Sequence, residues 1–292
     1  MTNQVTAGLD GSGASTAAVH WAAREAELRN TGLELVHATE WLEQPPLLLA
    51  STEIRGQWAE NLLRETSNEL RRLHPLLDIT SREVAGPPAE ALAAAARSST
   101  MLVIGSRGLG SSIAGFIVGS VGSATIAATE HPVVLVRSSG NAVAPADGLR
   151  THGAVVAGVD TRQLCDKVLA FAFEEAAHRR AALHVLHGWT PPPVLSFAPA
   201  LDPVALKELA HGITATLQEM LRPWRDKFPS VEVEVRAPIG HAAIQLVEAA
   251  SDAALVVVGR RIRSSTLGPH IGPITHAVLH HSTAPVAVVA HD

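Results

Sequence analysis

Cysteine is nearly missing from this chain, because Cys165 is the only one among 292 residues. No disulfide bond can therefore form within the chain, cysteine-rich metal sites are excluded, and a reducing compartment, the cytoplasm, is expected. Tyrosine is absent and aromatic residues make up 3% of the sequence, whereas hydrophobic residues make up 47%. This composition predicts a globular protein with a core of alanine, valine and leucine.

Basic charge and long apolar runs are also scarce. The formal net charge is −5 and the pI is near 6.3, which opposes nucleic-acid binding, since that needs a sustained basic surface. The longest uncharged stretch, Gly108 to Thr129, is interrupted by glycine and serine throughout, so no membrane span is expected. The first residues lack the pattern of a signal peptide, and secretion is not expected.

The two halves of the sequence repeat each other in order. The length is about twice the ~150 residues of one domain, and the offset between matching segments grows by four along the chain, which indicates an insertion. We expect a first domain at 1–138, a linker at 139–152 and a second domain at 153–292. The alternative is one continuous sheet with an internal duplication. The matching segments are Val5–Asp10 with Val155–Asp160, Leu33–Ala38 with Leu183–Gly188, Gly86–Leu92 with Gly240–Leu246, Leu102–Gly105 with Val256–Gly259, and Pro132–Val136 with Pro285–Val289.

Each half alternates short apolar runs with helical segments, the order that builds an open parallel sheet with helices on both faces. The helix predicted at Ser15–Arg29 has an apolar face, and we expect His20, Arg24 and Glu27 on its opposite face to point into water. The strands expected in the first half are Val5–Asp10, Leu33–Thr39, Asp78–Val84, Met101–Gly105 and Val133–Arg137. The further helices expected there are Arg55–Leu73, Ala89–Ser98 and Ser120–Thr129.

Glycine-rich loops follow the first and fourth strands, at the sheet edge where open parallel sheets bind ligands. The first loop starts at Asp10, and the second runs from Gly105 to Gly119, where a helix begins. Glycine permits positive φ, so successive N–H groups can point at one anion, and a free helix N-terminus attracts phosphate oxygens. A polyphosphate is the matching ligand. The alternative is that these glycines only permit tight turns and a helix start.

Polar side chains in the same loops suit such a ligand. Arg107 offers a cation, Ser120 a hydroxyl for a phosphate or a phosphate-bound Mg²⁺, and Asp10 a carboxylate for ribose hydroxyls. Neither the Walker glycine-lysine pattern nor the Gly-x-Gly-x-x-Gly pattern occurs, so P-loop hydrolysis and Rossmann hydride transfer lose support.

Over nearly its whole length the chain resembles a tandem universal stress protein of the kind common in actinobacteria. The resemblance is carried by Val5–Ser12, by Gly105–Gly108 with Gly119–Val121, and by His131–Val136. Nucleotide-binding members of that family carry Gly, two residues, Gly, nine residues, then Gly and Ser or Thr. The first half matches this pattern, except that ten residues separate the second glycine from the third.

The resemblance implies a nucleotide site in the first domain, with Asp10 at the ribose, Ala38 beside the adenine and the glycine loop around the phosphates. It also implies strand order 3-2-1-4-5 in each domain. Pairing is implied through the last strands, Val133–Val136 and Val286–Val289, between the tandem domains or between subunits of a homo-oligomer. The candidate nucleotide-binding residues are Gly8, Asp10, Ala38, Gly105, Ser106, Arg107, Gly108, Gly119 and Ser120.

The second half departs from the family pattern at two positions. Ile262 replaces the second glycine and resists positive φ, while Pro273 replaces the serine and has no N–H to offer a phosphate. We therefore expect the second domain to bind ATP weakly or not at all. Arg260, Arg261 and Arg263 there form either a solvated basic edge or a distinct anion site. No metal site is expected at His280 and His281, because adjacent side chains on a helix diverge.

Three functional hypotheses follow. The leading one is a stress-response module that binds ATP, ADP or AMP, with nucleotide ordering the Leu109–Phe116 loop and altering a surface for a protein partner. The second is a slow Mg²⁺-dependent ATPase, although the sequence shows no water-activating base and no catalytic residue is assigned. The third is a nucleotide-free dimerisation scaffold, which ATP would not stabilise against heat.

Overall fold

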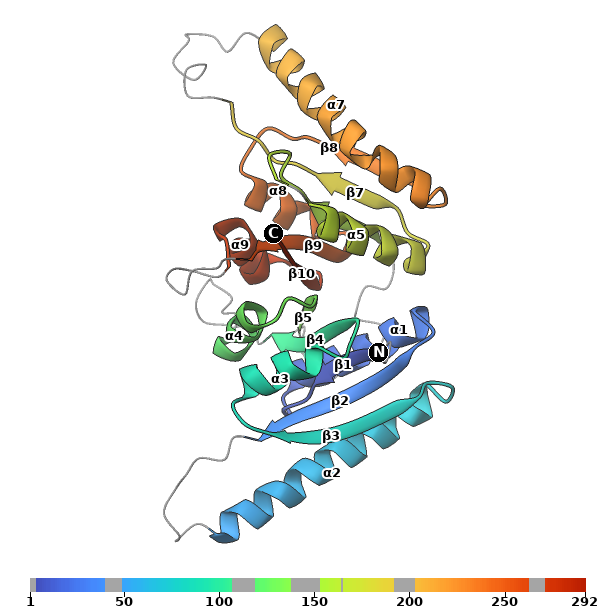
Figure 1. Cartoon of the computed structure of the whole chain (residues 1–292), viewed down its shortest axis with the longest axis vertical. Helices are drawn as coiled ribbons and strands as arrows, with labels where there is room; N and C mark the ends of the chain where they lie inside the picture. Colours follow the sequence, from blue (N-terminus) through green and yellow to red (C-terminus); the bar gives the residue numbers. More distant parts are fainter. Residues whose placement is uncertain are drawn as a thin grey trace. The chain divides into compact units, whose positions relative to one another are not determined.

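The computed structural model describes residues 4–39, 49–106, 119–137, 153–163, 165–191, 203–262 and 271–292, without the side chains of 49–55, 203 and 205. The chain divides into two compact units, Met1–Leu149 and Arg150–Asp292 (Figure 1). The linker predicted at 139–152 and the loop predicted at Leu109–Phe116 lie outside the described residues.

The first unit contains a five-stranded parallel sheet with strand order β3-β2-β1-β4-β5. This order and the predicted alternation of strands and helices are confirmed. The elements are β1 (Gln4–Gly8), α1 (Gly13–Leu28), β2 (Gly32–Thr39), α2 (Leu49–Leu73), β3 (Ile79–Ala85), α3 (Pro88–Ala96), β4 (Met101–Ser106), α4 (Ser120–Ala128) and β5 (Val133–Arg137).

The second unit repeats this arrangement, with strand order β8-β7-β6-β9-β10 and parallel pairing throughout. The predicted insertion falls between β7 and α7. Leu33 of β2 and Leu183 of β7 are offset by 150 residues, whereas α2 and α7, which both have 25 residues, start with an offset of 154. The elements are β6 (Ala154–Gly158), α5 (Asp166–Arg179), β7 (Leu183–Leu186), α7 (Pro203–Lys227), β8 (Val233–Arg236), α8 (Ala242–Ala249), β9 (Ala253–Arg261), α9 (Pro273–His281) and β10 (Val286–His291).

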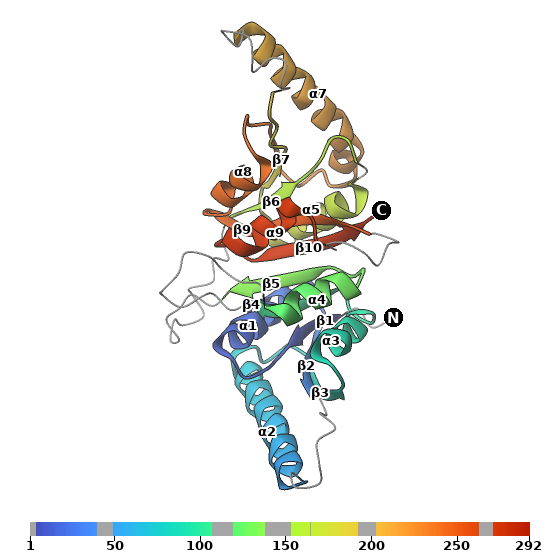
Figure 2. The same cartoon turned by 90° about the vertical axis from the view of Figure 1, so that its left-hand side faces the viewer.

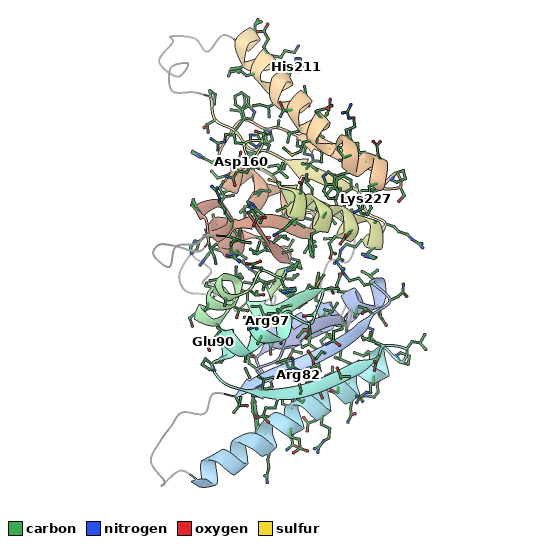
Figure 3. All side chains as sticks on the ribbon, in the orientation of Figure 1. Arg82, Glu90, Arg97, Asp160, His211 and Lys227 are labelled. Atoms are coloured by element: carbon green, nitrogen blue, oxygen red, sulfur yellow. The ribbon has the colours of Figure 1, made fainter. Side chains whose placement is uncertain are left out.

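Burial on both faces explains why the central strands are mostly apolar. In the first unit α1 packs against β1, β4 and β5, while α3 packs against α4 and contacts β1, β2 and β4 (Figure 2). Residues of both faces of β1 and β4 are therefore removed from water, and Val5, Ala7 and Met101 are fully buried. The edge is more polar: Arg82 of β3 pairs with Glu34 of β2, with 2.7 Å between Nε and Oε1 (Figure 3).

The polar face of α1 points into water only in part, because Glu27 is exposed as predicted but His20 is partly covered. The apolar face does pack into the core, but α2 lies beside the polar one. His20 Nε2 is 3.6 Å from Glu69 Oε1, and Glu27 Oε1 is 2.9 Å from His74 Nδ1. Burial lowers the pKa of His20, against the opposing effect of Glu69. The expectation was wrong for His20 because helix periodicity predicts which face is polar but not which neighbour covers it.

Candidate functional site

The turn after β1 holds Asp10 in a hydrogen-bonded loop that starts α1. Asp10 Oδ1 accepts a hydrogen bond from the Ser12 N–H at 2.9 Å, and the Asp10 N–H donates to Ser15 Oγ at 3.2 Å. Ser12 is the N-cap of α1, and its side chain accepts from the Ser15 N–H. Gly11 between them has φ +78°, which favours glycine. The short sequence from Asp10 to Ser15 therefore forms a hydrogen-bonded turn.

Gly105 allows the start of α1 to lie directly on β4. A Cβ atom at this position would lie 2.4 Å from the Ala14 carbonyl carbon and 2.6 Å from the Ser15 backbone nitrogen. Among the described glycines at the ends of β1 and β4, positive φ occurs at Gly11 and not at Gly105, and Gly119 at the start of α4 has φ −56°. Positive φ is therefore not what Gly105 and Gly119 contribute to this site. Gly105 is needed for close packing of helix on strand.

A cavity of about 300 Å³ opens where these elements meet, within the size range of small-molecule sites. Arg107 and Gly108, the other two predicted site residues, lie outside the described residues. The apolar part of the wall includes Leu92, Ile104 and Leu135, which the sequence did not single out. The structure brings together on the cavity wall the predicted residues Gly8, Asp10, Ala38, Gly105, Ser106, Gly119 and Ser120.

The first turn of α4 faces this cavity without a side-chain cap. Gly119 is the N-cap and makes no side-chain hydrogen bond to the helix, and no acidic residue lies in the first turn. Ser120, Val121 and Gly122 of that turn line the cavity. Backbone N–H groups at a helix N-terminus lack intrahelical acceptors and attract negative charge. This end of the cavity is suited to anionic oxygen atoms.

Arg137, which the sequence reasoning did not consider, ends the strand beside the cavity but is not among the residues that line it. It ends β5 and pairs in register with Ser106 of β4, just as Leu135 pairs with Ile104. Alternate residues of a strand point to the same face, so Arg137 leaves the sheet on the side of the cavity-lining Leu135. Burial lowers the pKa of Arg137 to about 10, so its guanidinium remains charged at neutral pH. The alternation of side chains along the strand after Leu135 could have predicted this position of Arg137 from the sequence.

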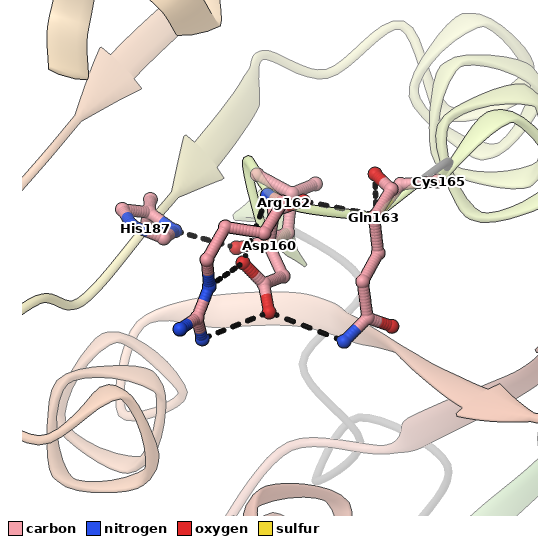
Figure 4. A network of polar contacts seen from close by, with 6 residues as sticks. Asp160, Arg162, Gln163, Cys165 and His187 are labelled. Atoms are coloured by element: carbon pink, nitrogen blue, oxygen red, sulfur yellow. Dashed lines mark hydrogen bonds and ion pairs between the residues drawn. The ribbon is translucent and has the colours of Figure 1, made fainter.

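The second unit has a cavity of similar size, about 310 Å³, in the equivalent place. Its polar groups are arranged differently, because Asp160 is bound by its own turn (Figure 4). Arg162 Nε and Nη2 lie 3.2 Å and 3.3 Å from the two carboxylate oxygens, and Gln163 Nε2 donates to Oδ2 at 3.3 Å. Burial alone would raise the pKa of Asp160, but hydrogen bonds and charge from Arg162 outweigh it and lower that pKa.

The rest of the second cavity also differs from the first. Pro273 occupies the first turn of α9, which removes a backbone donor as the sequence indicated. Helix α5 begins with Cys165 as its N-cap, and a Cβ atom at Gly259 would meet the imidazole of His291 at 2.7 Å instead of helix backbone. Burial raises the pKa of the Cys165 thiol. Among these differences only Pro273 was identified from the sequence.

Neither a membrane-spanning helix nor a metal-binding cluster is found in the part of the chain that the structure describes. No described helix is long and apolar enough to cross a membrane. No described group of three or more His, Cys, Asp or Glu side chains is placed to hold a metal ion. His276 and His280 stack with their ring centroids 4.2 Å apart.

Comparison with known proteins identifies the family. The model of the universal stress protein family matches residues 1–137 and 152–290. The chain belongs to this family. The universal stress proteins Rv1996 and Rv2005c of Mycobacterium tuberculosis are 30% and 31% identical to it over 304 and 293 residues. These alignments cover 97% of this chain and 94% and 96% of the two relatives, so all three are tandem proteins of the same length class.

Solved structures show the same fold. The crystal structure of a universal stress protein from Archaeoglobus fulgidus matches with a TM-score of 0.73 at 17% sequence identity, and the match covers 100% of both chains. The two family-matched regions and the two sheets of equal strand order agree with the predicted tandem universal stress protein.

Proposed function

We propose that the first unit binds an adenine nucleotide, ATP, ADP or AMP, and that the protein acts as a nucleotide-dependent regulatory module. The observation that carries this proposal is one cavity lined by the Asp10 turn, by Ala38 and by the start of α4. A carboxylate suits ribose hydroxyls, an apolar wall suits a base, and an uncapped helix N-terminus suits phosphates. A nucleotide is a ligand that uses all three.

The phosphate end of the proposed site combines neutral donors with a cation. The α4 backbone N–H groups and the Ser120 hydroxyl would contact phosphate oxygens or a phosphate-bound Mg²⁺. Arg137 would supply positive charge from the neighbouring strand. Arg107 and Gly108 are proposed to complete the cradle.

Binding is favoured over hydrolysis by the chemistry of the wall. Among the described residues that line the cavity, Asp10 is the one ionisable side chain, and the proposal assigns it to the ribose. General-base activation of water needs a second carboxylate or imidazole within hydrogen-bond reach. The described wall offers none, so this site supports a binding function.

The test is thermal unfolding and calorimetric titration of the full chain with ATP. Ligand at 100 times its Kd stabilises the folded state by about 2.7 kcal/mol, so millimolar ATP should raise Tm clearly. Gly119→Leu should abolish the shift without loss of folding, since a Cβ atom at Gly119 meets no atom within 4 Å. Gly272→Leu is the matched control, because Gly272 is the equivalent N-cap in the second unit and equally open.

The outcome that would contradict the proposal is a wild-type chain that neither binds ATP at millimolar concentration nor gains thermal stability from it. That result would favour the nucleotide-free scaffold. Assembly through the last strands, β5 or β10, is part of the proposal for the homo-oligomer, and light scattering on the full chain tests it.

A further inference from the structure

The indole of Trp58 on α2 rests on the turn that carries Asp10. A Cβ atom at Gly11 would lie 2.9 Å from Cζ2 and 3.2 Å from Cη2 of Trp58. The glycine therefore presents its bare Cα to the edge of the ring. Trp58 is 49% exposed, so much of this large apolar side chain remains in water although it sits against the turn. Core packing does not account for a half-exposed tryptophan at this place.

The same indole contacts the turn through a second residue. His37 and Trp58 form an edge-to-face pair with ring centroids 5.5 Å apart and an interplanar angle of 72°. His37 Nδ1 lies 2.7 Å from the Leu9 carbonyl oxygen. Trp58 thus acts on the chain on both sides of Asp10, directly at Gly11 and through His37 at Leu9. Neither Trp58 nor His37 lines the cavity itself.

The second unit shows the same place without the indole. Gly212 is the tenth residue of α7, as Trp58 is the tenth of α2, and Thr161 replaces Gly11. His187 keeps its contact with the Val159 carbonyl oxygen, at 3.0 Å. A hollow lies where the indole would be, lined by Thr161, Glu208, Leu209, Gly212, Ile213 and Thr216.

In both units the aspartate carboxylate accepts a hydrogen bond from the N–H two residues further on, but the other contacts that hold the two turns differ. In the second unit the side chains of Arg162 and Gln163 hold the Asp160 carboxylate from within the turn. In the first unit Ser12 and Gly13 stand at the corresponding positions and are too short for this contact. Packing of Trp58 from outside would fix the turn while leaving the carboxylate directed at the cavity.

We infer that Trp58 is a positioning residue, which holds the Asp10–Ser12 turn in the geometry that receives the nucleoside part of the ligand. This inference rests on the proposed nucleotide function for its consequence, but the order of the turn can be measured without ligand. Trp58 touches no ligand in this scheme. It acts through Gly11 and His37, and its ring is placed to report on the turn by fluorescence.

The experiment compares Trp58→Ala, Trp58→Phe and Leu73→Ala with the wild-type full chain. Leu73 is the matched control, since it lies on the same helix with 55% exposure and about 22 Å further along the helix axis. Amide hydrogen exchange at Gly11 and Ser12 is measured by NMR without nucleotide, and ATP affinity by calorimetry. The difference in fluorescence emission between the wild type and Trp58→Phe isolates the contribution of Trp58.

Trp58→Ala should speed exchange at Gly11 and Ser12 and weaken ATP binding by about tenfold, the scale of one aromatic contact. Trp58→Phe should recover most of both effects, Leu73→Ala should change neither, and ATP should alter the isolated Trp58 emission. Unchanged exchange in Trp58→Ala, or equal changes in Leu73→Ala, would overturn the inference. A wild type that binds no ATP would overturn the proposed function instead, and the exchange data would still decide the role of Trp58.

Discussion

Replacing Gly105 with alanine would drive a methyl group into the backbone of α1. The new Cβ atom would stand 2.4, 2.5 and 2.6 Å from the Ala14 carbon, the Ala14 oxygen and the Ser15 nitrogen. Carbon atoms normally approach to roughly 3.5 Å, so the helix start must move by about 1 Å. Overpacking of this kind costs about 1 to 3 kcal/mol. The movement would also displace the Asp10–Ser15 turn and its hydrogen bonds.

Thermal unfolding of the full chain followed by circular dichroism measures this cost. For a unit of this size 1 kcal/mol corresponds to roughly 2 to 4 °C, so Gly105→Ala should lower Tm by about 3 to 10 °C. Gly119→Ala and Gly259→Ala are the matched controls. An added Cβ meets nothing within 4 Å at Gly119 and a movable imidazole at Gly259, so both should lose less.

The same three variants decide what this glycine does. If Gly105→Ala melts within a degree or so of Gly119→Ala, the close approach of α1 to β4 does not constrain the fold, and the explanation given for Gly105 fails. If Gly105→Ala loses stability but keeps its ATP affinity, the helix start is not coupled to the turn. We expect Gly105→Ala to lose both stability and ATP affinity, because Ser15 lies against Gly105 and also accepts the hydrogen bond from the Asp10 N–H.

Three further results are expected from the charges and thiol of the two units. Arg137→Gln should weaken ATP binding about tenfold in calorimetry but leave adenosine binding unchanged, since a guanidinium acts on phosphate. Arg162→Ala should raise the pKa of Asp160 in an NMR titration. Because the folded-state pKa of Asp160 is lowered, this carboxylate contributes stability at neutral pH that is lost as the pH falls through that pKa. The variant should therefore lose less stability on acidification than the wild type. Cys165 should react slowly with a thiol reagent at pH 8 and rapidly in denaturant, because burial raises its pKa and suppresses the thiolate.

The fold was predictable because its signals are local and are repeated. Met101–Gly105 was expected as a strand and β4 spans Met101–Ser106, since an apolar run between polar segments identifies a strand buried on both faces. The internal repeat then predicted the same order of elements twice. The convergence of Asp10 with Ser120 was also predictable, because the ends of parallel strands share one edge of the sheet.

The contacts that shape the site were not predictable in the same way. Trp58 meets Gly11 across 47 residues of sequence, and no periodicity within α2 marks that position as different from its neighbours. The pairing of Arg162 with Asp160 is close in sequence, but whether an exposed arginine folds back depends on the turn geometry. The sequence does not show why position 105 needs a glycine, and only the path of α1 shows that crowding by its backbone is the reason.

The two units separate the constraints of the fold from those of the ligand. At Gly8 an added Cβ would lie 3.1 Å from Leu92, and at the equivalent Gly158 it would lie 2.8 Å from Leu246. In both units a glycine at the equivalent strand position therefore allows an equivalent leucine of the neighbouring helix to pack closely, although only the first unit is proposed to bind nucleotide. A residue kept in both units for this packing carries no information about a ligand.

Three of the positions that differ between the units lie at the cavities or next to them. Ser120 at the start of α4 corresponds to Pro273 at the start of α9. Arg137 of β5 corresponds to Ala290 of β10, and Ser12 of the first turn corresponds to Arg162. Each change removes a donor or a cation, or occupies the carboxylate, yet the second cavity keeps about 310 Å³. Since these changes leave the strands paired and the core filled, selection for folding alone does not explain why the first unit retains the other set. The proposed polyanionic ligand of the first unit is a requirement that would separate the two sets.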